Sequence, residues 1–166
     1  MGFLGGENLE IFGQLALAVL FGALIGIERE LARKTAGTRT FALVSLGACL
    51  FSIISKYAFQ EFWGVPGFDP SRIASQVVVG IGFIGAGAII FHQEGSRVQG
   101  LTTAAGLWVS AAIGMSVGYK LYAIAAATTL LTVLILVVLW FFEQKVLKRI
   151  AADRYLEDDK EQDISG

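Results

Sequence analysis

The chain has 166 residues, of which 55% are hydrophobic and only 16% charged, and its mean hydropathy is +0.66. A soluble domain carries roughly 25% charged residues, so this composition excludes an ordinary soluble globule and favours an integral membrane protein. The net charge of −1 gives no basic excess, and we expect no nucleic-acid partner. One cysteine, Cys49, and one histidine, His92, form neither a disulfide nor a His/Cys metal cluster, so we expect no enzyme and no cofactor.

The first apolar run covers residues 11–27 and contains one strongly polar side chain, Gln14. As a helix it extends about 26 Å, which is just enough to cross a bilayer. No basic residue precedes it and no small-residue cleavage site follows it, so we expect a membrane helix of the mature protein and not a signal peptide. The second run, residues 40–59, crosses if Lys56 extends its ammonium group to the membrane surface.

The third run covers residues 73–91 and follows Asp69 and Pro70, which we expect to be the N-cap and the first helical residue. The fourth and fifth runs cover residues 101–118 and 121–142. The connection between them is very short, and we expect Gly118 to end the fourth helix in the left-handed conformation. The pattern therefore predicts an all-α membrane protein with five transmembrane helices.

Positive charge is distributed unevenly between alternate loops, with ten basic residues on one side and three on the other. The side with more positive charge faces the cytoplasm. We therefore expect a multi-pass protein of the bacterial inner (plasma) membrane, with its N-terminus outside and its C-terminus in the cytoplasm. The ten residues are Arg29, Arg33, Lys34, Arg39, Arg97, Lys145, Lys148, Arg149, Arg154 and Lys160, and the three are Lys56, Arg72 and Lys120.

Beyond the fifth run, residues 143–156 alternate apolar and basic side chains as an amphipathic cytoplasmic helix does. Residues 157–166 include five acidic side chains, and we expect a disordered tail there.

Small residues recur on three of the predicted helices. The third run contains a literal G-x-G-x-x-G, but no strand precedes it, so we interpret it as a packing surface and not as a dinucleotide site. Small residues let helices approach closely in lipid, and faces left over favour a homo-oligomer, with a dimer expected over a monomer. The predicted packing residues are Gly22, Gly26, Gly80, Gly82, Gly85, Gly87, Gly106, Ser110, Gly114 and Gly118.

Polar residues cluster where the predicted helices meet the cytoplasm. Orientation and helix capping explain many of them, with Thr102 or Thr103 as the N-cap of the fourth helix. The sharper hypothesis is a site for a phosphate, a lipid headgroup or a partner carboxylate. Its candidate residues are Glu28, Arg29, Glu30, Arg39, Thr40, Arg97, Thr102 and Thr103. Within the membrane, we expect Gln76 and Lys56 to make inter-helix hydrogen bonds, and the residues leave direct magnesium binding open.

Three ordered segments, residues 26–30 with 36–40, residues 80–87 and residues 100–108, resemble the MgtC/SapB family of bacterial inner-membrane proteins. The resemblance implies a part in adaptation to low magnesium and, in pathogens, in survival inside macrophages. It also implies regulation of other membrane proteins, the ATP synthase among them, more than magnesium transport. Longer family members carry a soluble C-terminal domain that resembles ACT domains, and we expect this chain to be a short form without it.

Two functions follow as hypotheses. The first is a non-enzymatic regulator that docks onto itself or onto another membrane protein. The alternative is a transporter or channel for magnesium or another small ion, formed by an oligomer and lined by Gln76, Lys56 and the threonines of the fourth helix. An enzyme acting on lipid, with Glu28 or Glu30 as the base, ranks last because no nucleophile and base pair can be identified.

Overall fold

The structure is a computed structural model that describes residues 6–62, 64–69, 71–92 and 97–164. The chain divides into two units, residues 1–133 and residues 134–166, and each is described by itself. The elements in chain order are α1 (Gly6–Leu31), α2 (Thr38–Tyr57), the 3-10 helix η1 (Gln60–Phe62), α3 (Arg72–Gly87), β1 (Ile90–His92), β2 (Arg97–Gln99), α4 (Leu101–Gly118) and α5 (Tyr122–Ile164).

Four of these helices have the length and the apolar composition needed to cross a membrane: Gly6–Leu31, Thr38–Tyr57, Leu101–Gly118 and Tyr122–Phe142. The shorter helix α3 is also apolar and has 16 residues. A mostly helical membrane protein was expected, and this coarse class is confirmed.

A β-hairpin replaces the end of the third predicted helix. Helix α3 ends at Gly87, and the following strand pairs antiparallel with β2, so that Phe91 lies opposite Val98. The prediction of a helix to Phe91 is therefore wrong. Glycine is a poor helix former, and the four glycines between residues 80 and 87 weaken this end of α3. The isoleucines and the phenylalanine that follow favour a strand.

Two helix ends also differ from the sequence prediction. Ser71, not Asp69, directly precedes α3, and the Asp69 carboxylate accepts hydrogen bonds from the Ser71 backbone N–H at 2.9 Å and hydroxyl at 2.7 Å. Pro70 lies outside the described residues. Gly118 is the last residue of α4, and Lys120 takes the left-handed conformation with φ of 65°. Gly118 itself packs against Cys49 and Ser52 of α2.

The second unit is helical from residue 134 to Ile164. The predicted amphipathic segment, residues 143–156, is part of α5, and so are residues 157–164, for which disorder was predicted. Glutamate and lysine form helices readily, and acidic and basic residues spaced three or four apart support a helix. Local propensity therefore outweighs the acidic composition there.

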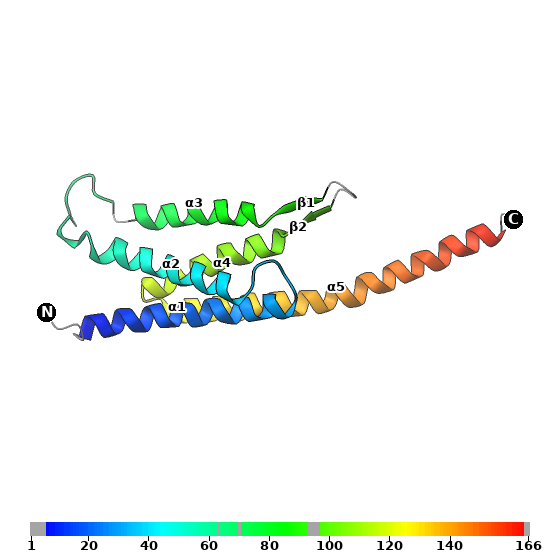
Figure 1. Cartoon of the computed structure of the whole chain (residues 1–166), viewed down its shortest axis with the longest axis horizontal. Helices are drawn as coiled ribbons and strands as arrows, with labels where there is room; N and C mark the ends of the chain where they lie inside the picture. Colours follow the sequence, from blue (N-terminus) through cyan, green and yellow to red (C-terminus); the bar gives the residue numbers. More distant parts are fainter. Residues whose placement is uncertain (1–5, 63, 70, 93–96, 165–166) are drawn as a thin grey trace. The chain divides into compact units, whose positions relative to one another are not determined.

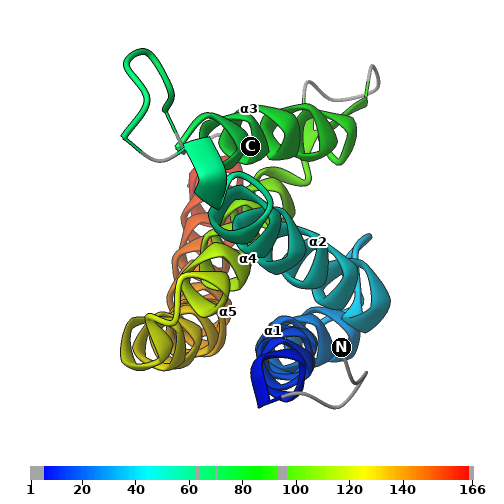
Figure 2. The same ribbon diagram turned by 90° about the vertical axis from the view of Figure 1, so that its left-hand side faces the viewer.

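In the first unit, α4 packs against α1, α2 and α3, and α2 also contacts both α1 and α3 (Figure 2). Helices α1 and α2 are antiparallel. Gly22 of α1 faces Phe41 of α2, and Gly26, which comes later in α1, faces Thr38, which comes earlier in α2. Helices α2 and α4 run parallel, because contacts that advance by four residues along one also advance by four along the other. These contacts pair Phe41 with Ser110, Ser45 with Gly114, and Cys49 with Gly118.

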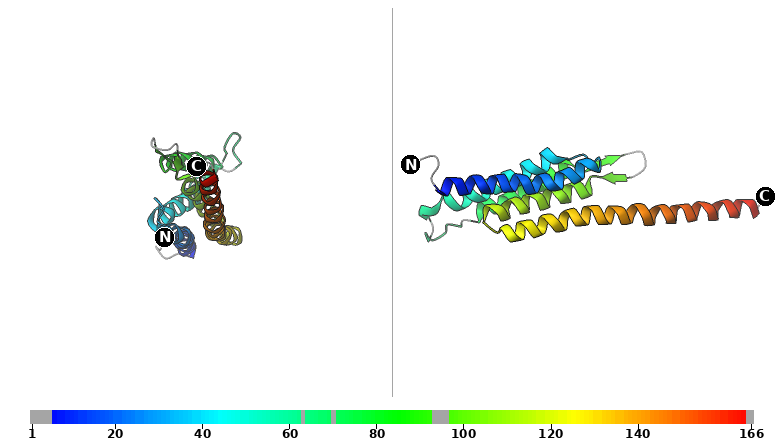
Figure 3. Two further views of the ribbon diagram at one scale, coloured as in Figure 1. Left: turned by 90° about the vertical axis from the view of Figure 1, so that its right-hand side faces the viewer. Right: turned by 90° about the horizontal axis from the view of Figure 1, so that it is seen from below.

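Two parallel helices that are joined by one connection require the chain to return between them. Helix α3 makes this return and packs antiparallel to α4, with Gly85 close to Ala104 (Figure 1). The β1–β2 hairpin, the end of α1 and the start of α4 consequently lie at the same end of the first unit (Figure 3, right). We call this end the rim.

Candidate functional site

At the rim, α1 ends in an ion pair between neighbouring residues. The Arg29 guanidinium donates from Nη2 to Glu28 Oε1 at 2.6 Å and from Nε to Glu28 Oε2. Arg29 is buried with 2% of its surface exposed. A buried charge is costly unless it is paired, and this bidentate geometry supplies a partner. The Glu28 carboxylate is thereby engaged within its own helix.

Glu30 holds the start of α2 in place. Its carboxylate Oε2 accepts hydrogen bonds from the Thr38 backbone N–H at 3.1 Å and from the Thr38 hydroxyl at 2.6 Å. The first N–H groups of a helix lack partners within the helix, so Glu30 caps α2 from the end of α1. A Cβ on Gly37 would lie 3.0 Å from the same oxygen, which explains the glycine in this turn.

Arg39 and Thr40 lie in the first turn of α2, and both are exposed. They do not take part in the Glu28–Arg29 pair or in the cap made by Glu30. Both side chains instead line one end of a groove between α2 and α3.

The start of α4 differs from the prediction. Gly100 precedes the helix with φ of 93°, and no side chain caps it, so the prediction of Thr102 or Thr103 as the N-cap is wrong. A Cβ on Gly100 would overlap the Ala88 carbonyl group, so the turn between α3 and β1 packs directly against Gly100. Thr102 is exposed and Thr103 is buried. The side chain of Arg97 lies outside the described part of the structure, and its predicted role remains a prediction.

The groove between α2 and α3 has a volume of about 770 Å³. Its two walls are α2 and α3, and Ala111 of α4 lies at its base. Arg39 lines it near the rim and Arg72 lines it at the opposite end. The other lining residues are Thr40, Leu43, Val44, Gly47, Ala48, Phe51, Ile73, Gln76, Val77, Gly80, Ile81 and Ile84.

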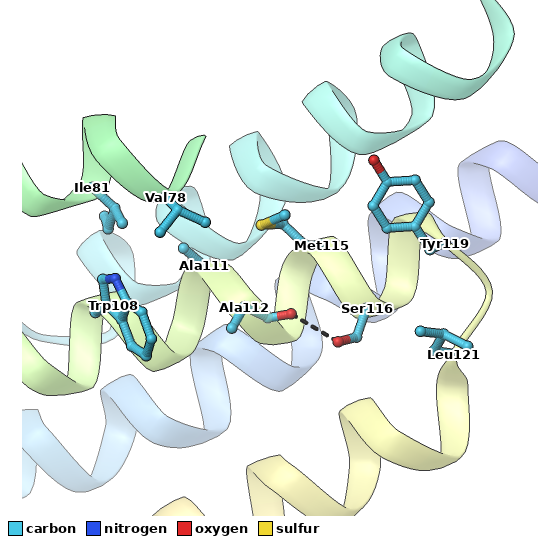
Figure 4. A pocket seen from close by; sticks show the side chains of 9 residues that line it. All are labelled: Val78, Ile81, Trp108, Ala111, Ala112, Met115, Ser116, Tyr119 and Leu121. Atoms are coloured by element: carbon cyan, nitrogen blue, oxygen red, sulfur yellow. Dashed lines mark hydrogen bonds between the residues drawn. The ribbon is translucent and has the colours of Figure 1, made fainter. Parts of the chain in front are cut away.

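A second hollow of about 270 Å³ lies between α3 and α4 (Figure 4). Ile81 and Ala111 line both hollows, so they form the partition between them. The Ser116 hydroxyl at this hollow donates to the Ala112 carbonyl of its own helix at 2.9 Å, which leaves an almost entirely apolar surface.

Buried polar side chains connect α1, α2 and α4. Gln14 donates from Nε2 to the carbonyl groups of Val117 at 2.9 Å and Gly118 at 3.2 Å, and it is 1% exposed. The Ser110 hydroxyl donates to the Phe41 carbonyl at 3.0 Å. The carbonyl groups of Val117 and Gly118 lie at the end of α4, where a helix leaves carbonyl groups without partners, and the Phe41 carbonyl of α2 accepts a bond from the neighbouring helix α4.

The glycines divide into two groups. Gly22 of α1 and Gly114 of α4 leave no room for a side chain: a Cβ on Gly22 would lie 2.6 Å from the Phe41 carbonyl oxygen, and a Cβ on Gly114 would overlap the Ser45 carbonyl oxygen. Gly26 and Gly118 are similarly close to α2 or to the turn before it, whereas a Cβ on Gly106 would lie 3.1 Å from the Phe41 ring. In α3, a Cβ on Gly85 would make an ordinary contact with Ala104. At Gly80, Gly82 and Gly87 nothing within the described chain approaches within 4 Å.

The two predicted intramembrane polar residues have different surroundings. Gln76 lines the groove, whereas Lys56 does not, and the Lys56 ammonium lies 5.3 Å from the centre of the Tyr57 ring. Sequence reasoning missed the roles of Gln14 and Gly47. Gln14 is the one strongly polar residue of its apolar run, and Gly47 interrupts an apolar helix, so each had a visible signal.

These features define a small, mostly helical membrane protein with polar residues at one end of the bundle. The chain belongs to the MgtC family, whose profile matches residues 15–145. No solved structure matches the chain.

Three relatives show how far the similarity extends. YhiD of Escherichia coli strain K12, which is provisionally designated a magnesium transporter, is 45% identical over 129 residues, covering 76% of this chain and 59% of YhiD. SapB of Bacillus subtilis strain 168 is 36% identical over 153 residues, covering 90% of this chain and 63% of SapB. MgtC of Salmonella typhimurium strain LT2 is 45% identical over 117 residues, covering 70% of this chain and 47% of MgtC. The chain thus spans less than two thirds of each of these relatives.

Proposed function

We propose that this chain is a non-enzymatic inner-membrane protein that takes part in adaptation to low magnesium by regulating other membrane proteins. The observation that carries the proposal is the state of the two rim carboxylates. Glu28 is paired with Arg29 and Glu30 caps α2. A hydrated Mg²⁺ in a protein is bound through one or two carboxylates, and here it would have to displace both internal partners.

The groove also supports regulation over magnesium transport. Arginines line both of its ends, and no acidic residue is among its described lining residues. Cation pathways in membranes use carboxylates that face the path. The guanidinium groups of Arg39 and Arg72 would repel a divalent cation that entered from either side.

Five membrane spans, with the N-terminus outside, belong to this proposal. The parallel arrangement of α2 and α4 supports a crossing by α3, because the chain must return between them. As a helix of 16 residues, α3 extends about 24 Å, which is short for a span but is supplemented by the flanking turns. The excess of basic residues near the rim supports a cytoplasmic rim.

A partner surface is part of the proposal as well. Helix α3 carries an exposed surface. Nothing lies within 4 Å of a Cβ on Gly82 or Gly87, and the side chain of Phe83 is 84% exposed. Small residues beside a large apolar one allow close packing of another helix in lipid. A homodimer or a complex with another membrane protein would use this surface.

The proposal is tested with the full chain reconstituted into liposomes that contain a magnesium-sensitive dye. With external Mg²⁺ and an inside-negative potential, we expect the same fluorescence as in protein-free liposomes, while a reconstituted magnesium channel gives influx. In a deletion strain at limiting magnesium, the wild-type gene restores growth, and Arg39→Ala or Gly85→Leu does not. Magnesium influx that increases with the amount of protein would overturn the regulator.

The alternative is the transporter, which the designation of YhiD favours. It predicts magnesium influx that is lost in Gln76→Ala. Native mass spectra of complexes released from membranes grown at limiting magnesium separate the two functions further, because a regulator is recovered with another membrane protein and a transporter is recovered as a homo-oligomer.

A further inference from the structure

The groove between α2 and α3 has the dimensions of a slot for one extended chain. It follows α2 from Arg39 to Phe51 and α3 from Arg72 to Ile84. Twelve residues of helix extend about 18 Å, so the groove covers more than half of the roughly 30 Å hydrocarbon thickness of a bilayer.

The groove is apolar along its length and open at its side. Leu43, Phe51 and Ile84 line it and remain 66%, 50% and 51% exposed. A Cβ added to Gly47 or Gly80, one on each wall, would meet nothing within 4 Å. The missing side chains at these two positions deepen the slot where the walls face each other.

Positive charge gathers at the rim end of the groove. Residues 28–40 contain four basic side chains, Arg29, Arg33, Lys34 and Arg39, against two acidic ones, Glu28 and Glu30, which leaves a net charge of +2. Arg29 neutralises Glu28. Glu30 attracts Arg39, but its carboxylate also accepts two hydrogen bonds from Thr38.

The opposite end of the groove is less positive. Arg72 is the basic residue that lines it, and Asp69, three residues earlier, interacts with that arginine electrostatically. An anion attached to an apolar chain in the groove is therefore favoured at Arg39 over Arg72.

We propose that the groove binds one phospholipid with an anionic headgroup, with one of its two acyl chains lying between α2 and α3 and its phosphate at Arg39 and the Thr40 hydroxyl. Arginine and hydroxyl groups are common donors to phosphate oxygens, and basic pockets between membrane helices bind anionic headgroups. The apolar slot and the positive end together select this ligand, because a second apolar helix would satisfy the slot and leave the charge at Arg39 without a counterpart. Lipid binding goes beyond the proposed function and is measured on purified protein, so it can fail without affecting the regulator.

The test is native mass spectrometry of the full chain, purified in detergent, with phosphatidylglycerol or with phosphatidylcholine of the same acyl chains. We expect one phosphatidylglycerol to be retained per chain, in preference to phosphatidylcholine. Arg39→Gln is expected to reduce that preference about fivefold. A basic residue near an anionic surface contributes roughly 1 kcal/mol, which corresponds to that change in affinity. Glycerol phosphate, which has the anion without the acyl chain, does not displace the lipid.

Two matched variants separate the groove from general surface effects. Lys34→Gln removes the same charge from an exposed rim residue that does not line the groove, and it lowers the preference less than Arg39→Gln does. Gly80→Leu fills the slot and releases both lipids, whereas Gly82→Leu, at an open position of α3 outside the groove, releases neither. Gly47→Leu repeats the block from the other wall, and circular dichroism verifies that each variant is folded.

Three results would overturn the proposal. If Lys34→Gln and Arg39→Gln lowered the preference for phosphatidylglycerol equally, overall surface charge and not the groove would explain that preference. Retention of no lipid by the wild type would leave the groove without this ligand. A dimer without lipid that dissociates in Gly80→Leu and in Gly47→Leu would show that a second copy of the chain occupies the groove.

Discussion

Gly114 lies where α4 crosses the backbone of α2, and its missing side chain sets the distance between the two helices. A Cβ at this position would overlap the carbonyl group of Ser45. A backbone carbonyl cannot rotate away as a flexible side chain does, so the helices would have to separate. Neighbouring contacts at Ser110 and Gly118 would then be lost as well.

Gly114→Ala is therefore expected to lower the free energy of unfolding in detergent by about 1–3 kcal/mol, the usual cost of overpacking a well-packed site. Gly82→Ala is the control, because its Cβ meets nothing and alanine favours a helix by up to ~1 kcal/mol over glycine. Reversible unfolding in dodecyl sulfate, followed by circular dichroism, measures both. Equal effects of the two substitutions would contradict this account of Gly114.

Glu30 provides a second test at the level of single residues. Glu30→Ala removes the acceptor for the Thr38 N–H and hydroxyl, so we expect faster amide hydrogen exchange at the start of α2. Glu30→Gln retains an amide oxygen that can accept and is expected to lie between the wild type and Glu30→Ala. Leu31→Ala, at a neighbour that is 81% exposed, should leave the exchange unchanged. Protection at Thr38 that is the same in all four proteins would exclude the cap.

At the level of elements, the ion pair between Lys120 and Glu10 joins the turn after α4 to the start of α1. The Lys120 ammonium lies 2.6 Å from Glu10 Oε1. This hydrogen bond, with a smaller contribution from Tyr57 of α2, raises the pKa of Lys120 above its ordinary value of 10.5, although desolvation opposes the shift. Three elements thus meet at one charged group.

The sign of its pH dependence follows from linkage. Because the pKa of Lys120 is higher in the folded state than in the unfolded state, the pair stabilises the fold fully below pH 10.5 and this stabilisation is lost as the pH rises through the raised pKa. The thermal midpoint of the wild type should fall in that range more steeply than the midpoint of Glu10→Gln, in which the main partner is removed. Parallel curves for the two proteins would contradict the linkage.

The sequence allowed the helices to be predicted better than their ends and partners. Continuous apolar runs identify helices through their length, and the four-residue spacing of Gly106, Ser110 and Gly114 predicts a smooth face. The same spacing does not say which helix packs there, because contacts such as Ser110 with Phe41 join residues 69 positions apart. The hairpin at Phe91 was missed because a short apolar run reads equally as a helix or a strand.

The candidate site was predicted in part. Glu28 and Glu30 at the end of the first helix stand out in the sequence because orientation does not require acidic residues there, whereas orientation also explains Arg39. Which carboxylate takes which partner could not be predicted, since Glu28 binds its own neighbour and Glu30 binds across the turn. The groove depends on the separation of α2 and α3, which no local pattern specifies.

For the whole molecule, the parallel pair α2 and α4 makes a prediction about membrane topology. In a Cys49→Ala background, single cysteines at Glu61, Thr35 and Gln99 report on successive connections. With an impermeant maleimide and intact spheroplasts, we expect labelling of Glu61→Cys, and labelling of Thr35→Cys and Gln99→Cys only after permeabilisation. Labelling of Gln99→Cys together with Glu61→Cys would mean that α3 does not cross the membrane.

The parallel pair also dictates an order of events during synthesis. The antiparallel hairpin of α1 and α2 can close as soon as Thr38 reaches Gly26, when α4 has not yet been made. Until α4 arrives, the Gln14 amide lacks the two carbonyl groups to which it donates in the finished protein. A chain released before residue 117 would therefore expose an unsatisfied amide to lipid or to the insertion machinery. Quality control in the membrane could recognise unfinished copies of this protein by that single side chain.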